Sequence, residues 1–189
     1  MTVSLAAAEG MLAEALHLLQ TRDSSLFAAL DDLPAAIYVT DLNGVIIYYN
    51  PACIAFAGRI PTVGQDRWCV TWKLYTEAGA FMPHDECPMA EAILKKVPIR
   101  GISAIAERPD GTRLNFLPFP TPLFDSRGQF TGAVNMLIDV TTQKRIATLR
   151  TQALRCRRLA ISVDDQKTAS TLQSLATEYE AEAKKLSVH

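Results

Sequence analysis

The residues of this chain that could do chemistry are few and scattered. Its four cysteines lie far apart without a Cys-x-x-Cys pair, which is typical of isolated reduced thiols and not of a disulfide framework or a zinc site. They are Cys53, Cys69, Cys87 and Cys156. The histidines are His17, His84 and His189. None of them stands with a serine and an aspartate in a recognisable nucleophile context, so we expect neither a metal site nor a catalytic triad.

Three pairs of acidic residues could in principle provide an acid and a base. They are Asp31-Asp32, Asp85-Glu86 and Asp164-Asp165. Each pair falls at the end of an expected helix, where favourable interaction with the helix dipole explains acidic side chains better than catalysis does. The sequence carries no enzyme signature, and we expect a protein that is not an enzyme.

The composition favours a folded domain with appended helices. The chain has 189 residues, of which 49% are hydrophobic, and 19 Lys and Arg balance 20 Asp and Glu. This balance predicts no general attraction to nucleic acid or to a membrane surface. The apolar stretch from Leu5 to Leu19 lacks a basic leader and contains Glu9 and Glu14, which favours a cytoplasmic location over a signal peptide.

Helical periodicity marks both ends of the chain. Leu5, Leu12, Leu19 and Leu26 recur every seven residues, which predicts an amphipathic, coiled-coil segment over residues 1–32. Thr21 to Ser25 interrupts this stripe, so one bent helix or two consecutive helices remain open. At the other end, Ile146, Leu149, Ala153, Cys156 and Ala160 alternate by three and four. A break at Ser162 to Asp165 and a last helix to Leu186 complete a predicted helical hairpin over residues 143–189, and we expect dimerisation through these helices.

Between the helical ends, short β-rich runs surround a helical middle. The expected strands are Ala36 to Thr40, Val45 to Tyr49, Ile99 to Glu107, Arg113 to Leu123 and Phe130 to Val140. The turns Asp41-Leu-Asn-Gly44 and Asp125-Ser-Arg-Gly128 have the residues that tight reversals need. Helices are expected over Pro51 to Ala57 and Asp85 to Lys96. Three prolines in Leu117 to Pro122 predict a bulge or an early end to that strand's ladder.

The order of these elements resembles a PAS domain. The matching residues are Asp41, Gly44, Asn50, Gly58, Arg108-Pro-Asp-Gly111, Pro122-Leu, Asp125, Gly128, Gly132 and Asp139-Val-Thr141. The resemblance covers roughly Leu26 to Arg145, with the domain itself at residues 33–142, and is closest in kind to a stand-alone bacterial PAS sensory protein with flanking helices. It implies an α+β fold, in which a five-stranded antiparallel sheet carries helices on one face and cups a small cavity.

Strand alternation then selects the residues expected to face such a cavity. From the strands these are Ile37, Val39, Ile46, Tyr48, Leu114, Phe116, Val134, Met136 and Ile138. Met89 and Ile93 are expected to cover them from the middle helix. The alternative is that these side chains simply fill a core.

The resemblance gives Asp139-Val-Thr141 a role in signal coupling, because this segment joins the last strand to the C-terminal helix. Asp139 or Thr141 is expected to cap that helix, and in PAS proteins an Arg or Lys often pairs with the aspartate. Arg145 is the main candidate for that partner, with Lys144 and Arg113 as others. The alternative is a structural helix start without a signalling role.

PAS proteins include flavin-binding, haem-binding and histidine kinase members, and each class requires particular residues. Covalent flavin chemistry is disfavoured, since Cys69 in Asp66-Arg-Trp-Cys-Val-Thr-Trp72 does not match the reactive-cysteine motif. His84 is a weak candidate for a haem ligand, and Cys69 for a redox site. Histidine kinase activity lacks both a phosphoacceptor histidine and a phosphate-binding glycine loop.

The expected function is therefore a sensory, signal-transducing homodimer. It would bind a small-molecule ligand or a signalling protein such as a histidine kinase or regulator, with no assigned cofactor. A haem or redox sensor and a non-sensing structural dimer are the alternatives.

Overall fold

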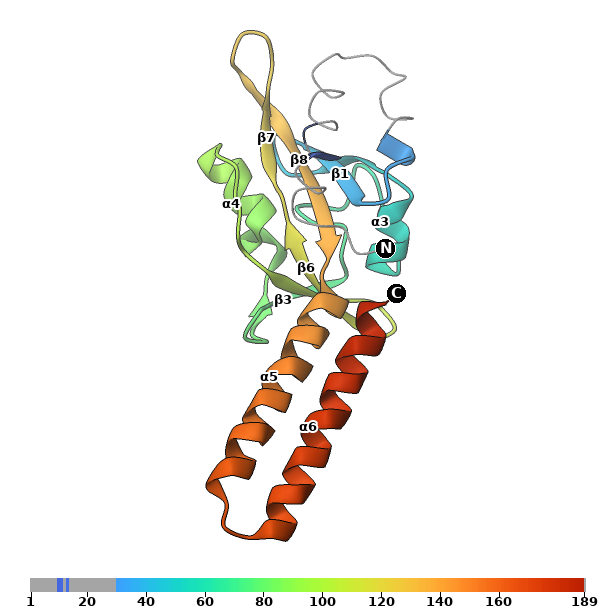
Figure 1. Cartoon of the computed structure of the whole chain (residues 1–189). Helices are drawn as coiled ribbons and strands as arrows, with labels where there is room; N and C mark the ends of the chain where they lie inside the picture. The colour runs from blue at the N-terminus through green and yellow to red at the C-terminus, as the bar shows by residue number, and fades with distance from the viewer. Residues whose placement is uncertain (1–9, 12, 14–29, 189) are drawn as a thin grey trace. The chain divides into compact units, whose positions relative to one another are not determined.

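The structure is a computed structural model that describes residues 10–11, 13 and 30–188 (Figure 1). The four leucines of the expected N-terminal coiled coil, Leu5, Leu12, Leu19 and Leu26, lie outside the described residues. The chain divides into two compact units, one ending at Asp139 and the other beginning at Val140. Each is described by itself. No helix in the described ranges is long and apolar enough to cross a membrane.

The first unit is built on one antiparallel sheet. Its strands are β1 (Ala36–Asp41), β2 (Ile46–Tyr49), β3 (Lys73–Thr76), β4 (Phe81–Met82), β5 (Ala104–Glu107), β6 (Arg113–Pro118), β7 (Thr121–Phe124) and β8 (Phe130–Asp139). The order across the sheet is β2-β1-β8-β6-β5-β3-β4, and β7 pairs with β8. The five expected strands account for the run β2-β1-β8-β6-β5 of this sheet. The short β3 and β4, which lie in a stretch expected to be irregular, extend one edge.

The proline-rich segment divides the expected fourth strand into two. β6 ends at Pro118 and β7 begins at Thr121, and both pair with β8. Pro120 cannot donate to the ladder, whereas the Phe119 amide donates both to the Met136 carbonyl and to the Asn135 side-chain oxygen, at 2.9 Å each. The ladder is therefore interrupted at Phe119 and Pro120 and resumes at Thr121 in the same register, so it neither ends early nor bulges there.

Helices of the first unit cover one face of the sheet. Among residues 36–139 they are α3 (Ala52–Ala57), the 3-10 turn η1 (His84–Glu86) and α4 (Pro88–Lys95). Cys53 and Phe56 of α3 and Met89 and Ile93 of α4 belong to one buried apolar cluster with side chains of β1, β6 and β8. The Phe56 and Phe116 rings meet edge to face, with centroids 5.4 Å apart.

The expected cavity face is wrong for six of the eleven positions. Ile46, Leu114, Phe116, Met89 and Ile93 do lie in the helix-covered cluster. Ile37, Val39, Tyr48, Val134, Met136 and Ile138 lie on the opposite face, because the cross-strand pairs of that face are Ile37 with Met136 and Val39 with both Val134 and Tyr48. The helix-covered face carries Tyr38 opposite Asn135 and Ala36 opposite Leu137.

The physical reason is that both faces of the central strands are buried. Every residue from Ala36 to Thr40 and from Gly132 to Ile138 is buried. Hydrophobicity therefore does not tell whether the odd-numbered or the even-numbered side chains of a strand face the helices. In β2 a register shift opposite Val39 and Thr40 makes Ile47 the extra residue. It places Ile46 and Tyr48 on different faces although they are two residues apart.

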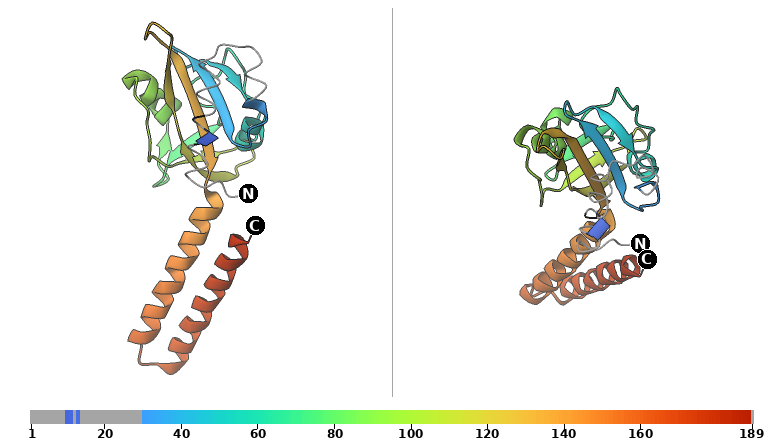
Figure 2. Two further views of the ribbon diagram at one scale, coloured as in Figure 1. Left: turned by 45° about the horizontal axis from the view of Figure 1, so that its top comes forward. Right: turned by 90° about the horizontal axis from the view of Figure 1, so that it is seen from above.

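The second unit is a helical hairpin of α5 (Thr141–Ser162) and α6 (Gln166–Ser187), which run side by side in both views of Figure 2. The expected break and recap are confirmed, since the Asp165 carboxylate accepts from the Thr168 amide at 2.8 Å. Small residues close the hairpin seam: Ala153, Ala160, Ala176 and Ala183 are buried. Leu149 is 7% exposed within the single chain, and Ile146 is half-buried.

The joint between β8 and α5 lies at Val140. The residue at the helix N-cap is Val140, whose own side chain makes no capping hydrogen bond, and the capping role expected of Asp139 or Thr141 stays a prediction. The Arg145 guanidinium pairs with Glu182 of α6 at 2.7 Å, and the pairing of Arg145 or Lys144 with Asp139 stays a prediction.

Candidate functional site

A polar hollow of about 440 Å³ opens on the first unit. Its lining comes mainly from the segment between α3 and β3, and His84 of η1 completes it. The lining residues are Arg59, Gln65, Asp66, Arg67, Trp68, Cys69, Thr71, Trp72 and His84. This set, which we call the polar hollow, combines charged groups, a hydroxyl, a thiol, an imidazole and two indole rings, and is unlike the apolar cavity expected beneath α4.

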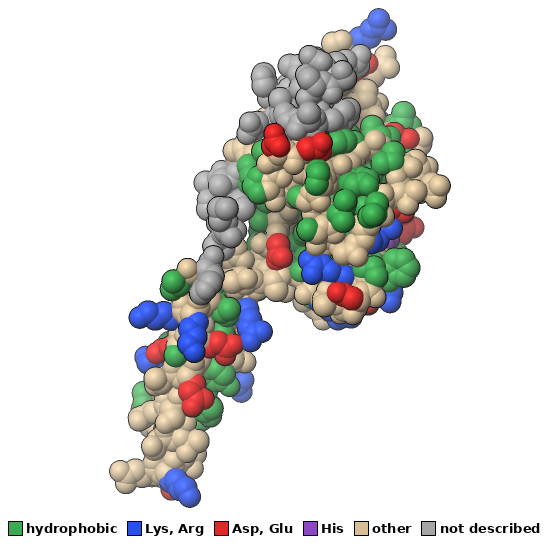
Figure 3. All heavy atoms as spheres, turned by 90° about the vertical axis from the view of Figure 1, so that its right-hand side faces the viewer, with side chains coloured by type: hydrophobic (Ala, Val, Ile, Leu, Met, Phe, Trp, Pro, Cys, Tyr) green, Lys and Arg blue, Asp and Glu red, His purple; other side chains and the backbone are tan. Residues whose placement is uncertain are grey.

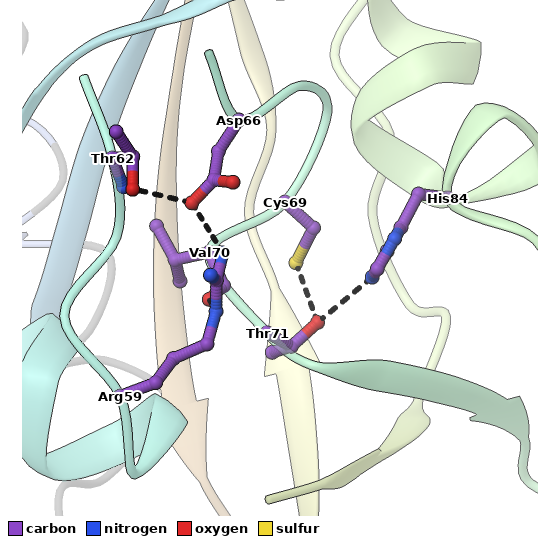
Figure 4. A network of polar contacts seen from close by, with 7 residues as sticks. All are labelled: Arg59, Thr62, Asp66, Cys69, Val70, Thr71 and His84. Carbon is purple, nitrogen blue, oxygen red and sulfur yellow. Dashed lines mark hydrogen bonds and ion pairs between the residues drawn. The ribbon is translucent and has the colours of Figure 1, made fainter. Parts of the chain in front are cut away.

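An ion pair fixes the shape of the wall on one side (Figure 4). The Arg59 guanidinium pairs with the Asp66 carboxylate, and its Nε donates to the Val70 carbonyl at 2.9 Å. The same carboxylate oxygen accepts from the Thr62 amide at 2.8 Å. Because both side chains are only partly exposed, this cluster can hold the segment in one conformation.

Trp68 has an unusual backbone for a bulky residue, with a φ of 68°. Such left-handed conformations cost about 1–3 kcal/mol and persist where surrounding contacts hold them. Here the Trp68 amide donates to the Gly44 carbonyl at 2.8 Å, and the Trp68 carbonyl accepts from the Tyr38 hydroxyl at 2.8 Å. The Arg67 guanidinium lies 5.2 Å from the centre of the indole ring. The site therefore contains a strained residue anchored to both β1 and the β1–β2 turn.

A line of polar groups begins at the edge of the hollow. His84 Nε2 lies 3.4 Å from the Thr71 hydroxyl, which lies 3.2 Å from the Cys69 sulfur. Figure 4 shows Thr71 between the two. Cys69 is buried, and burial raises the pKa of its thiol. Burial and the nearby Arg59 guanidinium lower the pKa of His84, so the imidazole is neutral at neutral pH.

The line continues through the core to the last strand. The Tyr38 hydroxyl donates at 2.8 Å to the carbonyl of Trp68, the residue bonded to Cys69, and it accepts from the Asn135 side-chain amide at 3.0 Å. Tyr38 is fully buried and Asn135 is 2% exposed. We call His84, Thr71, Cys69, Tyr38 and Asn135 the polar relay. It joins the hollow to β8, the strand that leads through Val140 into α5.

Lowering the pH should destabilise the protein through His84. Its folded-state pKa lies below the ordinary value of about 6.5, so the unfolded chain binds the proton more tightly. Stability is fully present above about pH 6.5 and is lost as the pH falls through the folded-state pKa. We expect the urea midpoint of the wild type to fall more between about pH 7.5 and about pH 5.5 than that of His84→Gln. Equal falls would contradict this linkage.

Sequence reasoning named Cys69 and His84 but missed how they are connected. Tyr38, Thr71, Asn135, Arg59 and Asp66 were not selected as site residues. The signal that was present is a polar Asn135 within an otherwise apolar run, Ala133 to Ile138. A buried amide needs partners, and Tyr38 on the adjacent strand supplies one.

Comparisons with known proteins find similar folds at low identity. No protein-family model matches the sequence, and comparison with curated proteins finds no relative. A PAS domain from Colwellia psychrerythraea is 21% identical, covering 60% of this chain and 92% of its own, with a TM-score of 0.41. The PAS domain of the fruit-fly ELK potassium channel is 14% identical, covering 62% of this chain and 95% of its own, with a TM-score of 0.49. A Rhodobacter sphaeroides LOV protein is 11% identical, covering 94% of this chain and 98% of its own, with a TM-score of 0.44.

The deciding feature is the topology of this chain itself. Five of its strands run β2-β1-β8-β6-β5 in an antiparallel sheet, and α3, η1 and α4 lie between β2 and β5 in the sequence. The chain has the PAS fold.

The PAS core does not fit a haem group at the polar hollow. His84 Nε2 faces the Thr71 hydroxyl, and the walls carry the charged side chains of Arg59, Asp66 and Arg67, whereas a porphyrin needs an enclosing apolar slot. Cys69 does not fit covalent flavin or redox chemistry, since burial and a raised pKa keep its thiol from the reactive thiolate form. Within residues 10–11, 13 and 30–188, no group of three or more His, Cys, Asp or Glu side chains could hold a metal ion.

Proposed function

We propose that this PAS protein is a sensory, signal-transducing module that acts by binding and not by catalysis. A small polar ligand enters the polar hollow of the domain at residues 33–142, and the change passes through the polar relay to β8 and into the hairpin at residues 143–189. The module works as a homodimer and signals to a partner protein. The observation that carries this proposal is the continuity of the relay from His84 to Asn135, in which the Trp68 carbonyl links Cys69 to the Tyr38 hydroxyl.

The chemistry of the hollow suits a ligand that is both polar and flat. Thr71 and the neutral His84 offer hydrogen-bonding groups, and the Trp72 side chain, 52% exposed, offers an aromatic face. The Arg67 guanidinium, held by the Asn43 carbonyl at 2.7 Å, adds positive charge. Small-molecule sites commonly combine such a few polar groups with aromatic walls.

The relay can transmit because its members are buried and depend on one another. The Tyr38 hydroxyl accepts from Asn135 and donates to the carbonyl of Trp68. Trp68 is bonded to Cys69, so a displacement of Cys69 moves the carbonyl to which the hydroxyl donates. In a low-dielectric interior such exchanges carry a larger free-energy difference than at the surface. A ligand that favours one arrangement shifts the population of both ends of the relay.

Tyr38→Phe should uncouple the hollow from β8. The variant leaves the Asn135 amide and the Trp68 carbonyl without this partner, at a cost of about 1–3 kcal/mol in the free energy of unfolding. The proton on His84 serves as the probe: in the wild type, the amide NMR signals of Asn135 and Met136 should shift with the titration of the His84 ring. In Tyr38→Phe those amide shifts should disappear while the ring still titrates.

The matched control is Tyr49→Phe, because Tyr49 stands directly across from Tyr38 in the β1–β2 ladder. It should keep the coupling. Amide shifts that persist unchanged in Tyr38→Phe would remove the relay from the mechanism and favour the non-sensing structural dimer.

A further inference from the structure

The helical hairpin has a marked charge asymmetry that the balanced charge of the whole chain conceals. α5 carries six basic residues and no acidic one: Lys144, Arg145, Arg150, Arg155, Arg157 and Arg158. In α6 three glutamates balance three lysines. Two of the arginines pair across the hairpin, Arg145 with Glu182 and Arg157 with Glu180, both at 2.7 Å. The Arg150, Arg155 and Arg158 side chains are exposed, so α5 is a positively charged helix.

One face of the hairpin is also hollowed. Two depressions of about 340 and 480 Å³ lie between the helices. Their lining comes from Arg150, Leu154, Arg157 and Ile161 of α5, and from Gln173, Thr177, Glu180, Ala183, Lys184 and Ser187 of α6. On each helix these residues follow one another at intervals of three and four, so they form one stripe per helix. We call the two stripes and the space between them the hairpin groove.

The hairpin groove exposes apolar side chains that no other described residue covers. Leu154 is 56% exposed and Ile161 is 86% exposed, and they stand seven residues apart on the same stripe. Figure 3 shows apolar and basic side chains together at the hairpin surface. Among the charged groups that line the groove, Arg150, Arg157 and Lys184 outweigh Glu180.

We propose that the hairpin groove binds an acidic amphipathic helix of a partner protein. Two parallel stripes of heptad spacing are the geometry into which a third helix packs its own apolar stripe. Leu154 and Ile161 supply the apolar contacts, and the excess of positive charge selects acidic residues at the edges of the incoming helix. The inference rests on the output role proposed for the hairpin, and names the chemistry of its partner.

The probe is a synthetic three-heptad peptide with leucine at its a and d positions and glutamate at its e and g positions. Fluorescence anisotropy on the full chain measures its affinity. We expect Leu154→Glu and Ile161→Glu each to weaken binding at least about tenfold, and rising salt to weaken it further. Leu159→Glu is the matched control, because Leu159 is an exposed leucine of α5, at 44%, outside the groove lining. It should bind as the wild type does.

Equal binding of a peptide with lysine in place of glutamate would overturn the proposal, as would unchanged binding by Leu154→Glu and Ile161→Glu. Preference for a single-stranded RNA oligonucleotide or for phosphatidylglycerol vesicles over the acidic peptide would also overturn it. So would self-association that buries the groove, detected by sedimentation and abolished by the same variants. The peptide can fail to bind while Tyr38→Phe still abolishes the amide shifts of Asn135 and Met136. In that case the groove assignment fails and the sensory proposal stands.

Discussion

Asn50→Ala is expected to lower the free energy of unfolding by roughly 3–5 kcal/mol, because several buried backbone groups lose their partner together. The Asn50 side-chain oxygen accepts from the Ile37 amide at 2.9 Å. Its side-chain nitrogen donates to the carbonyls of Leu30, Leu33 and Ala35, at 3.0, 3.3 and 2.8 Å. Asn50 is fully buried, so water cannot replace these bonds.

The loss should appear in the urea unfolding midpoint and should spread to β1. Asn50 ties the segment that precedes β1 to the start of α3, and β1 carries Tyr38 of the polar relay. We expect faster amide exchange at Ile37 and Tyr38 in the variant. Asn43→Ala is the matched control, since Asn43 is exposed in the β1–β2 turn, and it should change stability by less than about 0.5 kcal/mol. Similar midpoints for the two variants would show that the buried amide contributes little.

Features that depend on neighbours in sequence could be predicted closely. The turn Asp41 to Gly44 forms as expected: the Asp41 carboxylate accepts from the Asn43 and Val45 amides, and Gly44 has a φ of 79°. The Asp125 to Gly128 turn repeats this arrangement. In both, short polar side chains and a glycine determine the backbone locally, so the hairpins and their order follow from the sequence.

Features that depend on which side of the sheet meets the helices could not be predicted. Alternation correctly separated Ile37 from Tyr38, but both residues are fully buried, and burial on two faces removes the contrast that would orient the strand. The relay was missed for a related reason. Tyr38 and Asn135 are 97 residues apart in sequence, and only the register between β1 and β8 brings them together.

The position of the N-cap residue of α5 was not predicted, for a different reason. Asp139 and Thr141 have residue types that suit an N-cap, but the helix takes Val140 at that position. Propensity at a helix start is a local preference, and the continuous chain from β8 into α5 decides where helical geometry begins. Arg145 likewise finds an acidic partner on α6, 37 residues away in sequence, which the heptad pattern alone did not identify.

Gly44→Ala should disrupt the polar hollow, and Gly64→Ala should not, although both glycines have a φ of 79°. A Cβ atom at Gly44 would lie 2.2 Å from Cε3 of the Trp68 ring, whereas one at Gly64 has no neighbour within 4 Å. Both variants therefore bear the cost of a left-handed alanine, about 1–2 kcal/mol. Only Gly44→Ala must also move the indole.

Moving Trp68 has consequences beyond the clash. Its amide is bonded to Gly44 and its carbonyl to Tyr38, so displacement of the ring strains a residue already at positive φ and loosens the relay at its centre. We expect Gly44→Ala to lose roughly 2–4 kcal/mol more stability than Gly64→Ala, and to change the near-ultraviolet circular dichroism of the tryptophans. Because Gly64→Ala carries the same backbone strain, an equal loss in both variants would mean that the indole adapts freely and that the hollow is not held in one shape by the Gly44 contact.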